Sequence, residues 1–490
     1  MNRHAFFTAS LTAALLLLFG CDGGTTEDAG GGGEDAGTDA GTTETDAGFD
    51  AGPTMPDAGG GGCTGSGCEF VELDLGALHS CGRRGNGEVL CWGYNQDFQL
   101  GDNRQRHEEC ADPGTPPRDC SGRPVNVRLE TGGAFPIIDD ATALGVDGFS
   151  SSCALRGGQM WCWSYETVPQ VAGGIARLRR AAQLDNDLTD VRAASVTGSV
   201  GCVVRGESRE VLCVGDNIVG QLGRGDISQQ ELQYAPVLLD ATATPPVALT
   251  GVLQLEVAVG SFACARTATD VHCWGVDTSD QMGDRNEVTR TCRLSATENL
   301  ACAPDVRTVG GSEPLGVVSD ISVGAAHACA IVSAPSTPPT AGPVVCWGDN
   351  RMAQTGQPDP SGMQSIDRPT PVTAVRDAIQ LATGSRTTYA LHADGTISAW
   401  GYNDRGQLGD GVMNHGTRCT AGEDAGDCSI EPVAVAGIDD AVHISANASH
   451  ACAIRANGSV WCWGLNTSRQ LGDGTRETRF TPVMVLDTAP

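Results

Sequence analysis

Short runs of alternating apolar and polar residues recur along most of the chain, and the C-terminal segment shows them best. It holds four such runs, "AVHISA" from 441, "HACAIRA" from 450, "SVWCWG" from 459 and "TPVMVL" from 481. Each run is rich in β-branched or aromatic residues and has the two-residue period of a strand with one buried face. The pattern predicts four short β-strands here and no long helix.

A turn signal separates the second run from the third. In three copies an Asn-Gly or Asp-Gly dipeptide lies midway between them, starting at residues 86, 394 and 457. These residues tolerate the positive φ angles of a tight hairpin, so the two runs are expected to be antiparallel neighbours. The cysteine in each run then faces the other across the pair, at about the separation that a disulfide spans.

This unit occurs seven times. The residue after its second cysteine marks each copy: Trp92, Trp163, Val214, Trp274, Trp347, Trp400 and Trp463. Six copies keep a glycine nine residues later, usually after Gln-Leu, and the second copy, "WCWSYETVP", loses it. A four-stranded sheet of this size is stable only when its faces pack against neighbouring sheets. We therefore predict an all-β fold, a seven-bladed β-propeller that spans residues 63–490 as one domain.

The cysteines fit this arrangement. Six hairpin pairs are predicted, namely Cys81 with Cys91, Cys153 with Cys162, Cys202 with Cys213, Cys264 with Cys273, Cys329 with Cys346, and Cys452 with Cys462. Four local pairs remain, namely Cys63 with Cys68, Cys110 with Cys120, Cys292 with Cys302, and Cys419 with Cys428. In the sixth copy Tyr389 and Ala399 replace both cysteines together. Zinc is the alternative, but no Cys-x-x-Cys occurs, and an even count in an exported chain favours disulfides.

The first 20 residues have the features of an export signal. Arg3 lies in a short polar start, and an apolar run extends from Ala5 to Phe19. The run is short for a transmembrane helix, and the "LFGC" that ends at Cys21 resembles the bacterial lipobox, which implies lipidation of Cys21. A plain secretory signal or a buried apolar segment is the alternative. We expect an exported, lipid-anchored protein of the cell envelope or outer surface.

Residues 21–62 separate this signal from the propeller. They contain six copies of Asp-Ala-Gly among Gly and Thr, and no basic residue. Low hydrophobicity with charge of one sign cannot offset chain entropy, so we expect a disordered tether. Calcium binding is the alternative, but the Asp spacing is irregular and matches no calcium-loop template.

Charge excludes one class of partner. The net charge is −29, and all 31 basic residues are arginine. The first 68 residues hold ten acidic residues and one arginine, which leaves 50 acidic against 30 basic residues in the propeller. Such a surface repels a phosphate backbone, so nucleic-acid binding is not expected.

The repeated motif Cys-Trp-Gly-x-Asn-x-x-x-Gln-Leu-Gly resembles that of the regulator of chromosome condensation repeat, a seven-bladed β-propeller family, and in particular its exported bacterial members. The resemblance covers nearly all of residues 69–490, whereas WD-repeat and kelch propellers lack this Gln-Leu-Gly register. The family includes a guanine-nucleotide exchange factor, a plant light receptor and a bacterial β-lactamase inhibitor. What these share is protein binding, so the resemblance implies a protein partner.

Large insertions suggest which face of the propeller binds the protein partner. All but one follow the Gln-Leu-Gly, where the third-to-fourth loop emerges, so they are expected to share one face; "SAPSTPPTAGP" from 333 lies on the opposite face. Three of them carry one of the local cysteine pairs, and a disulfide lowers the entropy cost of using a loop in an interface. Protection from proteolysis is an equal alternative. The candidate partner-binding residues are Asp112, Arg118, Arg293, Glu298, Glu423 and Asp424.

His79, His327 and His450 share one repeat position, two residues before a cysteine. Other copies have Val200 or Phe262 there, so packing or turn hydrogen bonding is favoured over metal ligation. We find no nucleophile elbow, phosphate loop or zinc signature, and therefore predict no catalytic residue, metal or cofactor.

We expect a monomeric, lipid-anchored interaction module without catalysis. A carbohydrate-binding or carbohydrate-active propeller is the alternative, although the chain has few aromatic residues. A catalytic pair of carboxylates could be brought together by the fold from residues far apart in the sequence, so the sequence does not exclude it. Guanine-nucleotide exchange is a more remote alternative that rests on the family name only.

Overall fold

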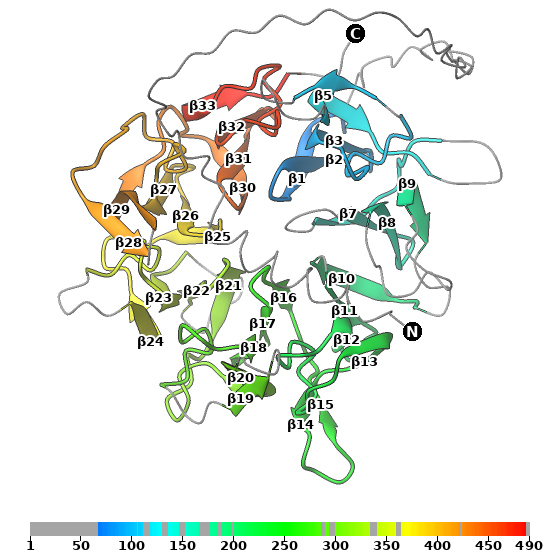
Figure 1. Cartoon of the computed structure of the whole chain (residues 1–490), viewed down its shortest axis with the longest axis vertical. Helices are drawn as coiled ribbons and strands as arrows, with labels where there is room; N and C mark the ends of the chain where they lie inside the picture. The colour runs from blue at the N-terminus through cyan, green and yellow to red at the C-terminus, as the bar shows by residue number, and fades with distance from the viewer. Residues whose placement is uncertain are drawn as a thin grey trace, which may run out of the picture. The chain divides into compact units, whose positions relative to one another are not determined.

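The computed structural model describes residues 67–486 except 105, 111–117, 130–135, 147–151, 166–176, 184–187, 198, 286–289, 294–298, 334–340, 359–363 and 422–423. The regular elements of this part are all strands. They group into seven sheets of four or five strands and one two-stranded ribbon. The seven sheets are arranged radially as the blades of a propeller (Figure 1). The prediction of an all-β, seven-bladed fold is confirmed.

Each blade starts at the centre of the ring and runs outward through antiparallel strands. The innermost strands are β1 (Phe70–Leu75), β6 (Ala143–Val146), β10 (Val191–Val196), β16 (Gln254–Val257), β21 (Val318–Val323), β25 (Ala378–Thr383) and β30 (Ala441–Asn447). The second strands are β2 (His79–Arg84), β7 (Ser152–Arg156), β11 (Val200–Arg205), β17 (Phe262–Arg266), β22 (His327–Val332), β26 (Thr387–His392) and β31 (His450–Arg455).

The outer half of each blade completes the sheet. The third strands are β3 (Val89–Tyr94), β8 (Gln159–Tyr165), β12 (Glu210–Asp216), β18 (Val271–Val276), β23 (Val344–Asp349), β27 (Ile397–Tyr402) and β32 (Val460–Gly464). The fourth strands are β5 (Asp119–Asn126), β9 (Arg177–Gln183), β13 (Gln230–Pro236), β20 (Asn299–Thr308), β24 (Ser365–Pro371), β29 (Asp424–Ala434) and β33 (Arg479–Met484). Blades 1, 4 and 6 have an extra outer strand: β4 (Glu108–Glu109), β19 (Arg290–Arg293) and β28 (Arg418–Ala421).

The second and third strands carry the hairpin disulfides. In six blades the two cysteines lie directly opposite each other in the strand register, as Cys81 and Cys91 do, and are bonded with Cα–Cα distances of 4.0 to 4.2 Å. In blade 6, Tyr389 faces Ala399 instead, and its hydroxyl donates to the carbonyl oxygen of Gln407 at 2.6 Å. The aromatic ring thus fills the space of the missing disulfide.

In six of the seven blades, the repeat tryptophan joins the blade to the preceding one. Six times its indole Nε1–H donates to the backbone carbonyl oxygen of the motif residue before Leu or its equivalent, at 2.8 to 3.1 Å. The pairs are Trp92 with Gln470, Trp163 with Gln99, Trp274 with Gln221, Trp347 with Gln281, Trp400 with Gln354, and Trp463 with Gln407. These indoles are at most 1% exposed. The tryptophan and the Gln-Leu-Gly of the repeat motif therefore form the contact between neighbouring blades.

The motif glycine has to be glycine because the indole packs directly on it. A Cβ atom at Gly101 would lie 2.5 Å from Cδ1 of Trp163, and the backbone there has a φ of +61°. Both the close approach and the left-handed backbone exclude a side chain. The sequence motif thus records a steric requirement between neighbouring blades.

Both irregular copies of the repeat meet at one interface. Blade 2 lacks the Gln-Leu-Gly, and blade 3, which would dock on it, has Val214 where the other blades have tryptophan. Among the described residues this interface is apolar packing, with Leu155 and Met160 of blade 2 against Val203 and Leu212 of blade 3. One partner of the tryptophan contact was replaced together with the other.

The ring closes between blade 7 and blade 1 without exchange of strands. Blade 7 consists of β30 to β33 and blade 1 of β1 to β5, so each is formed from one end of the chain. Figure 1 shows β30 beside β1, where the red and blue ends of the propeller meet. The Nδ2 of Asn447 donates to the carbonyl oxygen of Leu75 at 2.7 Å, and the Trp92 contact lies at the same interface. Closure therefore uses the same side-chain contacts as the other interfaces.

One insertion differs from the sequence expectation. Leu238–Asp240 (β14) and Val247–Ala248 (β15) form a separate antiparallel ribbon after the fourth strand of blade 3. Because this ribbon follows a fourth strand, it leaves from the end of the blade opposite the third-to-fourth loops. The expectation that only one large insertion lies away from those loops was wrong, since counting residues after the glycine does not show on which side of the fourth strand they fall.

Candidate partner-binding face and central channel

The three cysteine-bearing insertions form outer hairpins on blades 1, 4 and 6. In each, an extra strand pairs antiparallel with the start of the fourth strand, and a disulfide links the two. These bridges are diagonal in the register, since Cys292 lies opposite Leu300 but bonds to Cys302, and their Cα–Cα distances are 5.8 to 6.0 Å. We call these elements the braced hairpins. As third-to-fourth connections they all emerge on the same face of the propeller.

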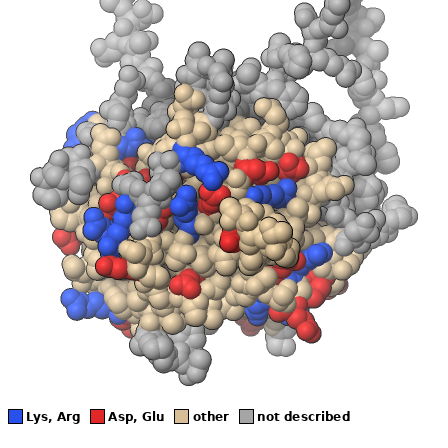
Figure 2. All heavy atoms as spheres, turned by 90° about the horizontal axis from the view of Figure 1, so that it is seen from below, with Lys and Arg blue, Asp and Glu red and all other residues tan. Residues whose placement is uncertain are grey.

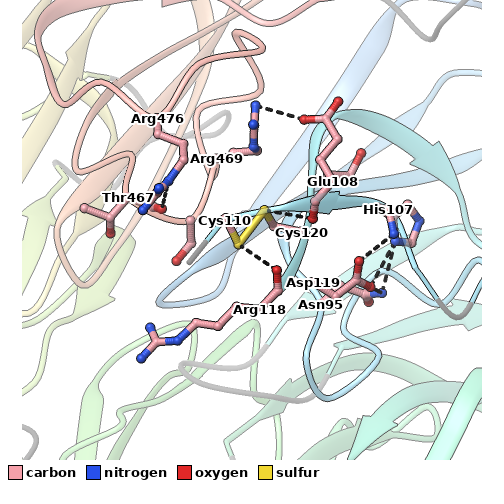
Figure 3. Close-up of a disulfide and its surroundings, with 12 residues drawn as sticks. Asn95, His107, Glu108, Cys110, Arg118, Asp119, Cys120, Thr467, Arg469 and Arg476 are labelled. Carbon is pink, nitrogen blue, oxygen red and sulfur yellow. Dashed lines mark hydrogen bonds and ion pairs between the residues drawn. A yellow bond between two sulfur atoms is a disulfide. The ribbon is translucent and has the colours of Figure 1, made fainter. Parts of the chain in front are cut away.

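A charged histidine holds the base of the blade 1 braced hairpin. The Nε2 of His107 lies 2.8 Å from Oδ2 of Asp102. Its Nδ1 lies 3.1 Å from Oδ2 of Asp119, as Figure 3 shows. Burial alone would lower the pKa of His107, but the hydrogen bonds and charges of the two carboxylates raise it to about 9. The imidazolium therefore links the loop after Gly101 to the fourth strand.

Blade 6 repeats this arrangement. His415 lies 2.8 Å from Asp410 and 2.7 Å from Asp427, and although burial opposes it, these two carboxylates raise the pKa of His415. Neither histidine was among the residues predicted for this site from the sequence. The signal was present, because in each copy Gly-Asp is followed five residues after the Asp by a histidine and later by Asp-Cys.

The blade 1 hairpin also contacts blade 7. The guanidinium NH1 of Arg469 lies 2.8 Å from Oε2 of Glu108, and the amide of Gly474 donates to the carbonyl oxygen of Gly122 at 3.1 Å. In Figure 3 the Arg469 and Arg476 side chains lie beside the Cys110–Cys120 disulfide. This braced hairpin is thus part of the interface that closes the ring.

Half of the six candidate binding residues belong to the described part of the chain. Arg118 is exposed just before β5, and its carbonyl oxygen accepts a hydrogen bond from the amide of Cys110 at 3.1 Å. Arg293 ends β19, and Asp424 begins β29. The other three candidates, together with Cys21 and Cys63, lie outside the described residues: Asp112, Glu298 and Glu423. Cys68 is disulfide-bonded.

Charges on the body are mixed. In the view of Figure 2 arginines and carboxylates alternate over the surface, and neither sign forms a continuous patch there. The described part of the chain contains several close ion pairs, such as Arg290 with Asp305 at 3.0 Å. The face in this view therefore offers no continuous basic site for a long polyanion.

The three repeat histidines are buried and link neighbouring blades. The Nε2 of each lies within hydrogen-bonding distance of a hydroxyl on the next blade. The pairs are His79 with Ser152 at 2.7 Å, His327 with Thr388 at 2.9 Å, and His450 with Ser80 at 2.9 Å. Burial lowers the pKa of His79 and His450 to about 3, so the rings are neutral. They bond to hydroxyls, as the packing interpretation expected.

At the closing interface these bonds form a network. The hydroxyl of Ser80 donates to the carbonyl oxygen of Gln470 at 2.9 Å, and the same carbonyl accepts from Trp92. Because the serine proton is used there, Nε2 of His450 must carry the proton that it shares with Ser80. Thr388 makes the same pair of contacts with Gln354 and His327 in blades 5 and 6.

A cavity of about 290 Å³ lies at the centre of the ring and is lined by the innermost strand of every blade. Polar side chains in it bond to the exposed backbone edge of the next strand. The side-chain amide of Gln254 bonds both backbone groups of Ile321, at 2.8 and 3.2 Å, and Asp320 accepts from the amide of Leu381 at 2.6 Å. These groups satisfy strand edges that have no neighbouring strand.

Two carboxyl groups of this channel are weakly acidic. Burial is the largest cause of a pKa of Glu256 that is raised to about 8; the hydrogen bond from Gln254 opposes it, and the nearby charges of Asp320 and Asp74 act in the same direction as burial. Burial likewise raises the pKa of Asp320 to about 6. Among the described residues no group of three or more His, Cys, Asp or Glu side chains is placed to hold a metal ion.

Comparison with known families gives matches to two family models, both described as regulator of chromosome condensation (RCC1) repeat. One matches residues 70–99, 378–407 and 441–470, and the other matches 457–488. These ranges lie in blades 1, 6 and 7. In the described part of the chain, no helix has the length and apolar character needed to span a membrane.

Two curated proteins are similar in sequence. The ultraviolet-B receptor UVR8 of Arabidopsis thaliana is 24% identical over 425 residues, which cover 85% of this chain and 82% of UVR8. The E3 ubiquitin-protein ligase HERC2 of Homo sapiens is 26% identical over 270 residues, which cover 54% of this chain and 5% of HERC2. The match thus spans only about a twentieth of HERC2.

A solved structure is similar in fold. In the crystal structure of Kap60 bound to yeast RCC1 (Prp20), the matched chain has a TM-score of 0.57 at 16% identity, over 85% of both chains. At this identity the likeness shows the fold alone.

Proposed function

Because the chain belongs to the RCC1-like repeat family, we propose that it is a protein-protein interaction module of the cell envelope, held by a lipid on Cys21 and without catalysis. The observation that supports this most is the set of three braced hairpins on one face. A hairpin fixed by a disulfide, and in two cases by a histidine held between two carboxylates, loses little entropy when it binds. The family fold is compatible with this use.

A relative supports the class of partner. The yeast RCC1 (Prp20) structure is that of a complex with another protein, Kap60. We propose the same kind of use for this chain, with a protein partner of the envelope that contacts the braced hairpins through residues such as Arg118, Arg293 and Asp424. The protein acts as a monomer in this proposal.

The cysteines support export. Nine disulfides lie in the described part of the chain, and disulfides persist in oxidising compartments. We propose that residues 1–20 are a lipoprotein-type signal, that residues 21–62 are a tether, and that the propeller starts at residue 63. Mass spectrometry of the mature protein tests the first step, since a lipid on Cys21 at the new N-terminus is expected.

The carbohydrate alternative receives no support from the tryptophan side chains. Six of the eight tryptophans are buried between blades. The other two, Trp161 and Trp461, each lie under an arginine, with the guanidinium carbon of Arg156 or Arg455 at 4.8 or 5.6 Å from the ring centre. A stacking platform for sugars requires free aromatic faces.

Affinity capture from cell envelopes tests the proposed function. Three forms of the oxidised protein are used: the intact chain, a variant with the three braced hairpins shortened, and a control with residues 333–341 shortened, an insertion that the sequence predicts for the opposite face. A protein retained by the intact chain and the control, but not by the first variant, is expected. Direct binding of that purified protein, with one hairpin restored at a time, then locates the contact. If all three forms retain the same material, the hairpins only protect the chain from proteolysis.

A further inference from the structure

The loop that contains the Gln-Leu-Gly is organised by the motif asparagine. In five blades its side-chain Oδ1 accepts a hydrogen bond from the backbone amide five residues later, at 3.0 to 3.2 Å. These residues are Asn95, Asn217, Asn350, Asn403 and Asn466. The loop is thus closed from inside by one side chain.

The other end of the same side chain is a donor. The Nδ2 of Asn403 donates to the carbonyl oxygen of Val412 at 2.9 Å, and that of Asn466 donates to Oδ1 of Asp473 at 3.0 Å. In the other three blades Nδ2 likewise has an oxygen acceptor. This position therefore needs one group that accepts and one that donates.

Blade 4 has aspartate at this position. The Oδ1 of Asp277 accepts from the amide of Met282 at 3.1 Å, as the asparagines do. Its second oxygen then occupies the place of the donor, and an ionised carboxylate has no proton to donate. Asp284 corresponds in the repeat to Asp473, and both Asp277 and Asp284 are only 6% exposed. Two carboxyl groups are thus buried in one loop.

We propose that a proton on Asp277 latches the blade 4 loop, residues 277–285, and that loss of this proton loosens it. With the proton, Asp277 donates as asparagine does. Without it, a buried negative charge lies close to the charged carboxyl groups of Asp280 and Asp284, which disfavours the closed loop.

The charged surroundings agree with a proton held near neutral pH. Burial is the largest cause of a pKa of Asp277 that is raised to about 7, and the charges of Asp284 and Asp280 act in the same direction. The amide of Met282 and the guanidinium of Arg307 on β20 act in the opposite direction. Asp277 therefore gains or loses its proton within a pH range that an exported protein can encounter.

Loosening would reach two neighbours. The carbonyl oxygen of Gln281 accepts from Trp347 of blade 5 at 2.9 Å, so the loop is part of the blade 4–5 interface. The amide of Asp277 donates to the carbonyl oxygen of Ala301 at 3.0 Å, in the strand that carries the blade 4 braced hairpin. The latch thus connects pH to the proposed binding face, although its test is independent of that function.

The direction of the pH effect follows from the raised pKa. The stabilisation by protonated Asp277 is fully present below the pKa of about 4 that this aspartate has in the unfolded chain. It is lost as the pH rises to the folded-state pKa of about 7, and it changes no further above that pH. Asp277→Asn keeps the donor at every pH. The Tm of Asp277→Asn minus that of the unchanged protein should be near zero at pH 4.5, grow to at least about 2 °C by pH 7, and then level off. A difference that does not depend on pH would overturn the proposal.

Two further measurements keep the test sharp. Asn466→Asp recreates the carboxyl pair in blade 7, beside Asp473. The Tm of this variant, relative to that of the unchanged protein, should fall over the same pH range. If this variant does not fold, Asn217→Asp beside Asp226 is measured in its place. Hydrogen exchange of residues 277–285, corrected for intrinsic rates, should accelerate between pH 4.5 and about 7 and then level off in the unchanged protein, and should not do so in Asp277→Asn. Equal acceleration in both proteins would contradict the latch.

Discussion

At the residue scale, positions in neighbouring blades are matched to each other. Each blade that has a histidine two residues before its first hairpin cysteine is followed by a blade with Ser80, Ser152 or Thr388 as its partner. At the other four interfaces the residue in the hydroxyl position is glycine or alanine. A buried hydroxyl or imidazole N–H without a partner is costly, so the two residue types occur together or not at all.

The buried imidazolium of blade 1 gives a prediction at this scale. His107→Ala should destabilise the braced hairpin by about 1.5 to 3 kcal/mol, because it removes two hydrogen bonds to carboxylates and leaves Asp102 and Asp119 buried together. The histidine's contribution is complete below its unfolded-state pKa of about 6.5 and is lost as the pH rises through about 9.

Chemical denaturation between pH 6 and 10 measures this effect. Arg106→Ala, at an exposed neighbouring position, is the control and should keep the pH profile of the unchanged protein. Identical profiles for His107→Ala and the unchanged protein would mean that the imidazolium adds no stability.

At the scale of elements, the blade is a hairpin with a docking loop. The second and third strands form the disulfide-bonded hairpin, and the loop after the third strand presents a carbonyl and a glycine to the next tryptophan. Six blades thus present an indole to the loop of the preceding blade. The blade 2–3 interface lacks both parts among the described residues and relies on apolar packing.

The motif glycine yields a prediction with a matched control. Gly101→Ala places a Cβ at 2.5 Å from Trp163 at a φ of +61°, so steric overlap adds to the cost of a left-handed alanine. The total loss should be about 3 to 5 kcal/mol. Gly157→Ala has a similar φ of +57° but nothing within 4 Å, so it should lose only about 1 to 2 kcal/mol. Urea denaturation compares the two; equal losses would show that the indole gives way.

At the scale of the whole molecule, the ring is closed by side chains and not by a shared sheet. Blades 7 and 1 come from opposite ends of the chain, and the His450–Ser80–Gln470–Trp92 network joins them. Stability of the ring therefore depends on contacts between residues about 370 to 390 positions apart.

A double-mutant cycle tests this closure. Ser80→Ala should cost about 1 to 3 kcal/mol, because it leaves the N–H of His450 buried without an acceptor. The blade 4–5 interface of the same chain has Phe262 and Ala328 at the two equivalent positions. Ser80→Ala combined with His450→Phe should therefore recover most of the loss in thermal unfolding. Additive losses would show that the two residues do not act as a pair.

The fold and the bridging of cysteines could be predicted because their signals are local. A strand alternates with a period of two, a hairpin turn lies between its strands, and the hairpin cysteines are 9 to 17 residues apart. Seven such units form one closed ring because each sheet buries its faces only against its neighbours. The site was less predictable: the hairpins were found, but His107, His415 and the role of Asp277 were not.

By itself, the sequence determined the number of blades, the strand order within each blade and the local disulfides, since all of these follow from repeats and short separations. Only the tertiary structure decided which side chains meet between blades, such as His450 with Ser80, and which carboxyl groups lose water, such as Glu256 and Asp277. The physical reason is that hydrogen-bond partners and pKa values depend on the surroundings of a group, and ring closure brings those surroundings from distant parts of the chain.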